Sequence, residues 1–218
     1  MPESARDGRS YALIGVMVAF SWPSLANLIT GGGNLTSTSG DVRTIAIEWS
    51  IALILAAMAF GGQGLRPQFF RLTAFGWRDL LYMIGALVVT FVIAGIISRV
   101  VAPPQFDIKR IASVPILARA TLVITAGICE EFIFRGFAIE EIGLLTGNRT
   151  LGATLSVIFF GLGHAGTYGF STALLIPTTI GVMITLLYMR RNSLPACMLM
   201  HATIDGLVVI LVPALTAK

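Results

Sequence analysis

The stretch Thr150–Met189, TLGATLSVIFFGLGHAGTYGFSTALLIPTTIGVMITLLYM, contains no Asp, Glu, Lys or Arg. A transmembrane helix needs about 20 mostly apolar residues, so this stretch is too long for a single crossing. Its segment Gly166-Thr-Tyr-Gly169 interrupts the apolar run with glycines, which favour a break between helices. We therefore expect a helical hairpin that crosses a membrane twice.

The rest of the chain has the same character, because 56% of its 218 residues are hydrophobic and only 12% are charged. Soluble domains carry roughly 25% charged residues. Lipid offers the backbone no hydrogen-bond partners, so each crossing must be a helix or part of a closed barrel, and these runs lack the alternation of a barrel. The other candidate crossings are Tyr11–Thr30, Trp49–Leu65, Leu81–Ser98, the apolar residues on both sides of Glu130, and Leu194–Ala214.

These windows predict an all-α fold: a polytopic bundle of about seven (six to eight) transmembrane helices with a polar intramembrane cavity. The chain has no internal repeat and no linker long enough to divide it. We expect a single membrane domain, 1–218. Within it, residues 1–110 would supply N-terminal helices, and residues 111–214 would form the core that carries the chemistry.

The basic residues predict the orientation of the helices. With seven crossings and the N-terminus inside, nine of the 15 basic residues fall on the inner side, which favours a cytoplasmic N-terminus in a multi-pass protein of the cell (inner) membrane. The net charge of +4 then reflects topology, and no base-reading motif points to nucleic acid. The inner set is Arg6, Arg9, Arg66, Arg71, Arg78, Arg135, Arg149, Arg190 and Arg191.

Charged residues interrupt the apolar pattern in Gly127–Gly136, GICEEFIFRG. At about 100° per residue, Glu131 and Arg135 fall within about 40° of each other and can form an ion pair, whereas Glu130 points to another part of the bundle. An ionisable residue within a crossing costs at least about 2.5–3.5 kcal/mol. A buried carboxylate without a local partner is suited to act as a general base, which is the role we expect for Glu130.

The two histidines of the chain, His164 and His201, both lie in expected crossings. Asp205 follows His201 by one helical turn and could orient its imidazole or bind a reacting oxygen. Phe160 precedes His164 by one turn, where it would pack against the ring or line a pocket. A carboxylate with two imidazoles suits hydrolysis.

Two other uses of these groups stay open. Glu130, His164 and His201 are ordinary zinc ligands, although they come from three helices without a metal-binding spacing. Buried Glu and His side chains also mark proton and ion transporters.

Three motifs occur in order along the chain: EExxxR at 130–135, FxxxH at 160–164 and HxxxD at 201–205. Together they resemble the CPBP family of CAAX-protease and bacteriocin-processing membrane proteins, also called the Abi family, over roughly Ala118–Gly206. This resemblance implies an intramembrane endopeptidase that acts on a membrane-embedded or membrane-anchored protein or peptide. An alternative within the same family is a non-proteolytic membrane protein that serves as an immunity factor, a scaffold or a subunit of a membrane complex.

The resemblance also implies a role for each motif residue. Glu130 would activate water, and Glu131 and Arg135 would hold its helix in place. His164 and His201 would complete the water and oxyanion site. Asp205 occupies a position where the family often has asparagine. No cofactor is expected, with zinc as the alternative.

Overall fold

The computed structural model describes residues 3–30, 38–100, 108–168, 170 and 174–216, and these are almost entirely helical, with no β-strand among them. The expected all-α fold is confirmed. The α-helices are α1 (Glu3–Thr30), α2 (Thr38–Ala56), α3 (Trp77–Val100), α4 (Ile108–Ser113), α5 (Ile116–Glu131), α6 (Glu140–Thr146), α7 (Arg149–Gly163), α8 (Ala165–Tyr168), α9 (Leu175–Arg191), α10 (Leu194–Asp205) and α11 (Val212–Thr216). Three segments have the wider turn of a π-helix, η1 (Ala57–Gly62), η3 (Phe132–Ile139) and η5 (Gly206–Leu211), and η2 (Pro67–Phe70) is a 3₁₀-helix.

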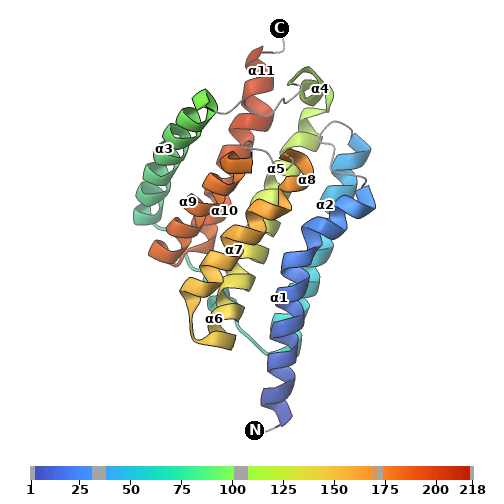
Figure 1. Cartoon of the computed structure of the whole chain (residues 1–218), viewed down its shortest axis with the longest axis vertical. Coiled ribbons are helices and arrows are strands. Elements are labelled where there is room, and N and C mark those ends of the chain that lie inside the picture. The colour runs from blue at the N-terminus through green and yellow to red at the C-terminus, as the bar shows by residue number, and fades with distance from the viewer. Residues whose placement is uncertain (1–2, 31–37, 101–107, 169, 171–173, 217–218) are drawn as a thin grey trace.

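The long helices run side by side along the longest axis of the molecule (Figure 1). Helix α5 continues through η3 into α6 and occupies a central position, packed against α2 on one side and α10 on the other. Helix α3 packs against α9, and α1 packs against α2. The three motif segments therefore lie on neighbouring helices: EExxxR on α5 and η3, FxxxH on α7 with His164 as its C-cap, and HxxxD on α10.

Small residues and one long-range hydrogen bond set the approach of these helices. A side chain at Gly127 would stand 2.9 Å from the Cβ atom of Ala202, so glycine is what allows α5 and α10 to lie in contact. On the other side of α5, the indole N–H of Trp49 donates to the hydroxyl oxygen of Thr125 over 3.1 Å. This hydrogen bond fixes the N-terminal helix α2 against the core.

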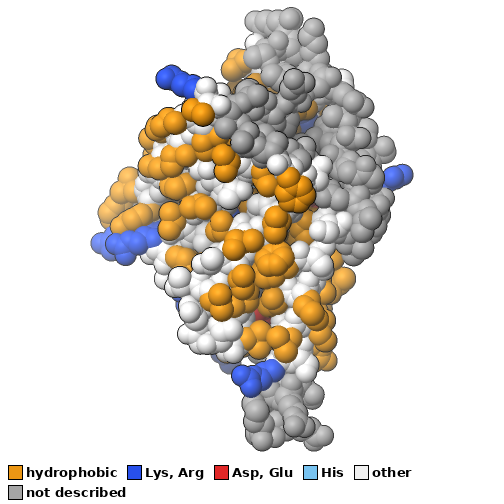
Figure 2. Space-filling model, viewed as in Figure 1, with side chains coloured by type: hydrophobic (Ala, Val, Ile, Leu, Met, Phe, Trp, Pro, Cys, Tyr) orange, Lys and Arg blue, Asp and Glu red, His pale blue; other side chains and the backbone are white. Residues whose placement is uncertain are grey.

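The surface of the bundle is apolar. Three helices of the described part are long and apolar enough to cross a membrane: Val42–Gly62, Trp77–Val100 and Leu194–Leu215. Figure 2 shows hydrophobic side chains spread over the visible face, with basic side chains near its borders. Exposed apolar surface of this extent favours a lipid environment. How many of the remaining helices cross the membrane stays a prediction.

The expected hairpin within 150–189 is confirmed, since α7 and α9 are its two arms. The window Leu194–Ala214 is also continuous, as α10, η5 and α11. The start of the second window was wrong, because α2 begins at Thr38 and not at Trp49. Thr38, Ser39 and Asp41 are polar residues of the kinds that favour helix starts, and such residues do not appear in a search for apolar runs.

Glu140 binds several groups at the end of the bundle where α6 lies. Its Oε1 atom accepts from the Tyr188 hydroxyl at 2.8 Å, from Arg149 at 2.6 Å and from Arg71 at 3.4 Å. Arg119, near the opposite end, donates to backbone carbonyls of residues 114 and 209. Arg71 and Arg149 thus lie at the same end of the bundle. Both were assigned to the inner set, and this arrangement is compatible with that prediction. The side of the membrane that this end faces stays a prediction.

Candidate functional site

Glu131 and Arg135 form the ion pair that their spacing predicts. The Arg135 Nη1 atom lies 2.9 Å from Glu131 Oε1, and neither side chain has any solvent exposure. Glu131 is the last residue of α5, and Arg135 lies in the π-helical segment η3. Wider turns of this kind are frequent at functional sites.

The remaining donors of Arg135 connect three helices. Its Nε atom donates to the Thr185 hydroxyl at 3.3 Å, and its Nη2 atom donates to the Gly181 carbonyl at 3.0 Å, both on α9. Its guanidinium also lies over the ring of Phe160 on α7, 4.4 Å from the ring centre. These contacts tie Arg135 to α7 and α9.

His201 lies between two carboxylates. Its Nδ1 atom is 2.7 Å from Glu131 Oε1, and its Nε2 atom is 3.5 Å from Asp205 Oδ2. A protonated imidazole can donate to both carboxylates, whereas a neutral one can donate to only one. Asp205 lies beside His201 as predicted. The direct hydrogen bond to Glu131 is a new feature, because we expected the imidazole to accompany Glu130.

Phe160 lies between the two imidazoles. Its ring centre is 4.5 Å from that of His164 and 6.0 Å from that of His201. The backbone carbonyl of Phe160 is 2.8 Å from His164 Nδ1. Because a carbonyl only accepts hydrogen bonds, Nδ1 must carry a proton, and the lone pair of a neutral ring is then on Nε2. The expected packing of Phe160 against His164 is confirmed.

Glu130 differs from its neighbour Glu131 in its surroundings. Its Oε2 atom is buried and has no hydrogen-bond partner among the described residues. Its carboxyl group is within electrostatic range of the His164, His201 and Asp205 side chains. The four residues that we singled out as catalytic candidates therefore gather in one polar cluster within an apolar bundle.

The cluster does not fit a zinc ion in this arrangement. No group of three or more His, Cys, Asp or Glu side chains in the described ranges is placed to hold a metal. A histidine ligand must direct a nitrogen lone pair at the metal. In His201, however, both ring nitrogens face carboxylate oxygens.

One further acidic side chain belongs to the same surroundings and was missed in the sequence. Glu48 on α2 is only 3% exposed, and its carboxyl group is within electrostatic range of Glu130, His201 and Asp205. It stands directly before the apolar window that begins at Trp49. Its position at the edge of a long apolar run was the only sequence signal for a role in the site. This signal is weak, because an acid in such a position usually marks a helix end.

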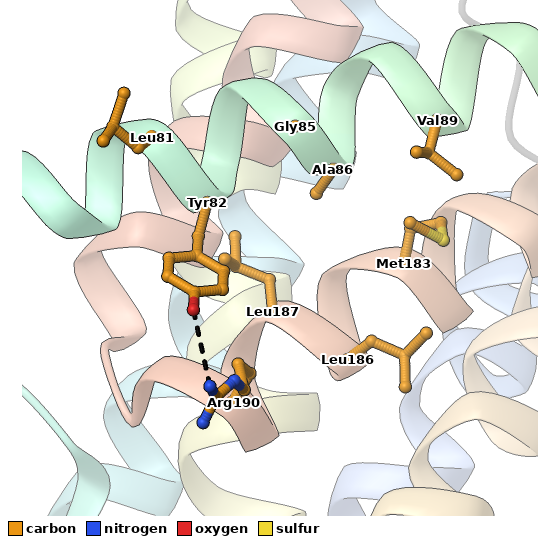
Figure 3. Close-up of a pocket in the computed structure, with 9 residues that line it drawn as sticks. All are labelled: Leu81, Tyr82, Gly85, Ala86, Val89, Met183, Leu186, Leu187 and Arg190. Atoms are coloured by element: carbon orange, nitrogen blue, oxygen red, sulfur yellow. Dashed lines mark hydrogen bonds between the residues drawn. The ribbon is translucent and has the colours of Figure 1, made fainter.

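A groove on the bundle surface is separate from this cluster. It lies between α3 and α9, has a volume of about 430 Å³ and is lined mainly by apolar side chains such as Leu81, Val89 and Met183 (Figure 3). At one end the Arg190 guanidinium donates to the Tyr82 hydroxyl over 3.4 Å. None of the motif residues lines this groove. The motif residues therefore lie in the polar cluster and not in the groove.

Comparison with known proteins agrees with the three motifs. A family model described as Rce1-like, type II CAAX prenyl endopeptidase Rce1-like, matches residues 112–207. No curated protein and no solved structure gives a significant match. The matched residues contain EExxxR, FxxxH and HxxxD, and they begin after the N-terminal helices α1 to α3.

Proposed function

We propose that the protein is an intramembrane endopeptidase in which Glu130 activates water, because residues 112–207 match the Rce1-like family model. Its substrate is a membrane-embedded or membrane-anchored protein or peptide. The observation that carries this proposal is the contrast between the two adjacent acids. Glu131 is neutralised by Arg135 and His201, whereas Glu130 Oε2 has no hydrogen-bond partner in the described part of the chain.

The reaction begins when the Glu130 carboxylate takes a proton from water. The oxygen of that water attacks the carbonyl carbon of the scissile peptide bond, and the carbonyl oxygen becomes an oxyanion. Glu130 then gives its proton to the leaving nitrogen, the C–N bond breaks, and a carboxylic acid and an amine are released. General acid–base assistance of this kind contributes about 10²–10⁴-fold to the rate.

The histidines serve the water and the oxyanion. His164 donates from Nδ1 to a backbone carbonyl, so its Nε2 lone pair can accept a hydrogen bond from the attacking water. His201 lies between Glu131 and Asp205, and its positive charge stabilises the negative charge that develops in the transition state. Asp205 orients His201 in this mechanism, because an ionised carboxylate cannot donate a hydrogen bond to an oxyanion.

The decisive experiment compares wild type with Glu130→Gln after reconstitution into liposomes. The probes are a prenylated peptide with a C-terminal CAAX sequence, its unprenylated counterpart and a peptide with a transmembrane segment. We expect wild type to cleave at least one probe and Glu130→Gln to lose at least about 10²-fold in rate. The matched control is Glu141→Gln, the same substitution on α6, which continues from α5 and η3. This variant should retain cleavage.

Two outcomes would contradict the proposal. Cleavage by Glu130→Gln at the wild-type rate would remove Glu130 from the base role. Loss of cleavage by wild type in the presence of a chelator would favour the zinc alternative. A cellular phenotype that survives Glu130→Gln would instead support a non-proteolytic role as an immunity factor, scaffold or subunit of a membrane complex.

A further inference from the structure

Glu48 is a buried acid without a structural partner. The described part of the chain has other acids in the bundle, and each of them has a polar partner: Asp79 with Arg191, Glu131 with Arg135, Glu140 with Arg149, Glu141 with Gln63 and Asp205 with His201. Within the same residues, Glu48 and Glu130 form no such pair, and the Oε2 atom of each is buried without a hydrogen-bond partner. A structural role in an ion pair therefore does not account for Glu48.

Glu48 lies on the helix that packs beside the candidate site. Its helix α2 packs along α5, and the adjacent Trp49 is tied to Thr125 of α5 by a hydrogen bond of 3.1 Å. The charged and titratable groups around it are Glu130 and the Cys129 thiol on α5, and His201 and Asp205 on α10. Glu48 is thus the group that α2 contributes to the polar cluster.

Two unpaired carboxyl groups at close quarters in an apolar interior do not both ionise, since the second charge would have to be placed beside the first without water to screen it. Such a pair shares one proton, and its environment decides which group holds it. Glu130 lies on α5, which packs directly against α10 and thus against the helix of His201, whereas Glu48 lies on α2, on the other side of α5. Glu48 is also the more buried of the two. The negative charge therefore belongs on Glu130.

We propose that Glu48 is a positioning residue of the site, which keeps its proton and thereby leaves a single negative charge on Glu130. In the resting site the pair would hold one proton, on Glu48. When Glu130 takes a proton from water, the pair holds two, and Glu130 passes one to the leaving nitrogen. The pair then returns to its starting state, so the step needs no other reagent. This catalytic consequence rests on the proposed function, whereas the location of the proton does not.

The proton on Glu48 can be observed directly by infrared spectroscopy of the full-length protein in liposomes at mildly alkaline pH. A protonated carboxyl group absorbs at a frequency distinct from that of a carboxylate. We expect wild type to show a protonated-carboxyl band that Glu48→Gln lacks and Glu130→Gln retains. A Glu141→Gln variant identifies any contribution from Glu141. Loss of the band in Glu130→Gln but not in Glu48→Gln, or its absence from wild type, would overturn the proposal.

Cleavage of the same peptide probes gives a second readout. We expect kcat/KM to fall by about 10-fold in Glu48→Gln, which keeps a neutral polar group, and by about 100-fold in Glu48→Leu, which does not. Equal rates for wild type and Glu48→Leu would contradict a positioning role. If wild type cleaves no probe while the band behaves as expected, the proposed function fails and the proton assignment stands. If wild type cleaves a probe and the band belongs to Glu130, the proposed function stands and the proton assignment fails.

Discussion

The Nδ1 atom of His201 lies 2.7 Å from Oε1 of Glu131, the acid directly after the candidate base. The same oxygen accepts a hydrogen bond of 2.9 Å from Arg135. Arg135 and His201 thus converge on one carboxylate oxygen, and the helical turn between consecutive residues keeps Glu130 out of this arrangement. Two adjacent glutamates have acquired different environments, one neutralised and one not.

Arg135→Gln should destabilise the fold severely. It leaves Glu131 buried with His201 as its remaining partner, and removing one member of a buried ion pair costs about 3–5 kcal/mol. The midpoint of thermal unfolding in detergent measures this loss. The double variant Glu131→Gln/Arg135→Gln should unfold at a higher temperature than Arg135→Gln alone, because no uncompensated charge remains. A double variant less stable than the single one would contradict this account.

Gly181→Ala on α9 should disturb the ion pair between Glu131 and Arg135. A methyl group at this position would stand 2.8 Å from the Phe160 ring and 3.5 Å from Arg135 Nη2. We expect a loss of about 1–3 kcal/mol from overpacking, measured by thermal unfolding, with a parallel loss of cleavage. Gly85→Ala on α3 is the control, because a methyl group there meets no atom within 4 Å. It should leave stability unchanged or raise it by about 0.5–1 kcal/mol.

Phe160→Leu should reduce cleavage more than it reduces stability. The ring contacts both imidazoles and the Arg135 guanidinium, so its loss lets the two histidines shift relative to Glu130. Phe159→Leu changes the adjacent residue, which stacks on Phe20 with ring centres 4.2 Å apart and lies on another face of α7. Peptide cleavage and thermal unfolding, measured on both variants, separate the two effects. Equal losses of cleavage in the two variants would contradict a special role for Phe160.

Glu141 should make stability depend on pH. It follows the crossing on α6, near the end that holds Arg71 and Arg149, and burial raises its pKa from 4.5 to about 7 despite the hydrogen bond from Gln63. Between these values the unfolded chain is ionised while the folded chain keeps its proton, so stability falls as pH rises. We expect a loss of about 1–2 kcal/mol as the pH rises through this range, which allows for screening near the end of the bundle.

The pH dependence due to Glu141 is measured as the unfolding midpoint at mildly acidic and mildly alkaline pH. Glu141→Gln removes the titrating group and should make the midpoint less dependent on pH. A variant with the same pH dependence as wild type would assign the effect to another group.

Local spacing predicted much of the site. The turn of the helix alone placed Arg135 beside Glu131 and Asp205 beside His201, and both contacts are present. These are interactions within one continuous helix, for which the distance follows from the number of intervening residues. The apolar windows likewise predicted the hairpin of α7 and α9.

Contacts between helices could not be predicted in the same way. The hydrogen bond from His201 to Glu131 depends on how α10 packs on α5, which is set by the close approach at Gly127. Glu48 was missed because the search looked for windows without charged residues, and Glu48 directly precedes such a window. Glu140 was missed for a similar reason: its partners Arg71, Arg149 and Tyr188 are distant in sequence and meet only when the bundle has formed.

The hydrogen bond between Trp49 and Thr125 bears on how the chain can be divided. The matched segment 112–207 omits α2, so a fragment limited to it would expose Thr125 and lose the acid at position 48. The boundary of sequence similarity is thus not the boundary of the packed unit. Split expression tests this directly. Two polypeptides, 1–106 and 107–218, are produced in one membrane and should reassemble through α2 and α5. The second polypeptide alone should not cleave any probe.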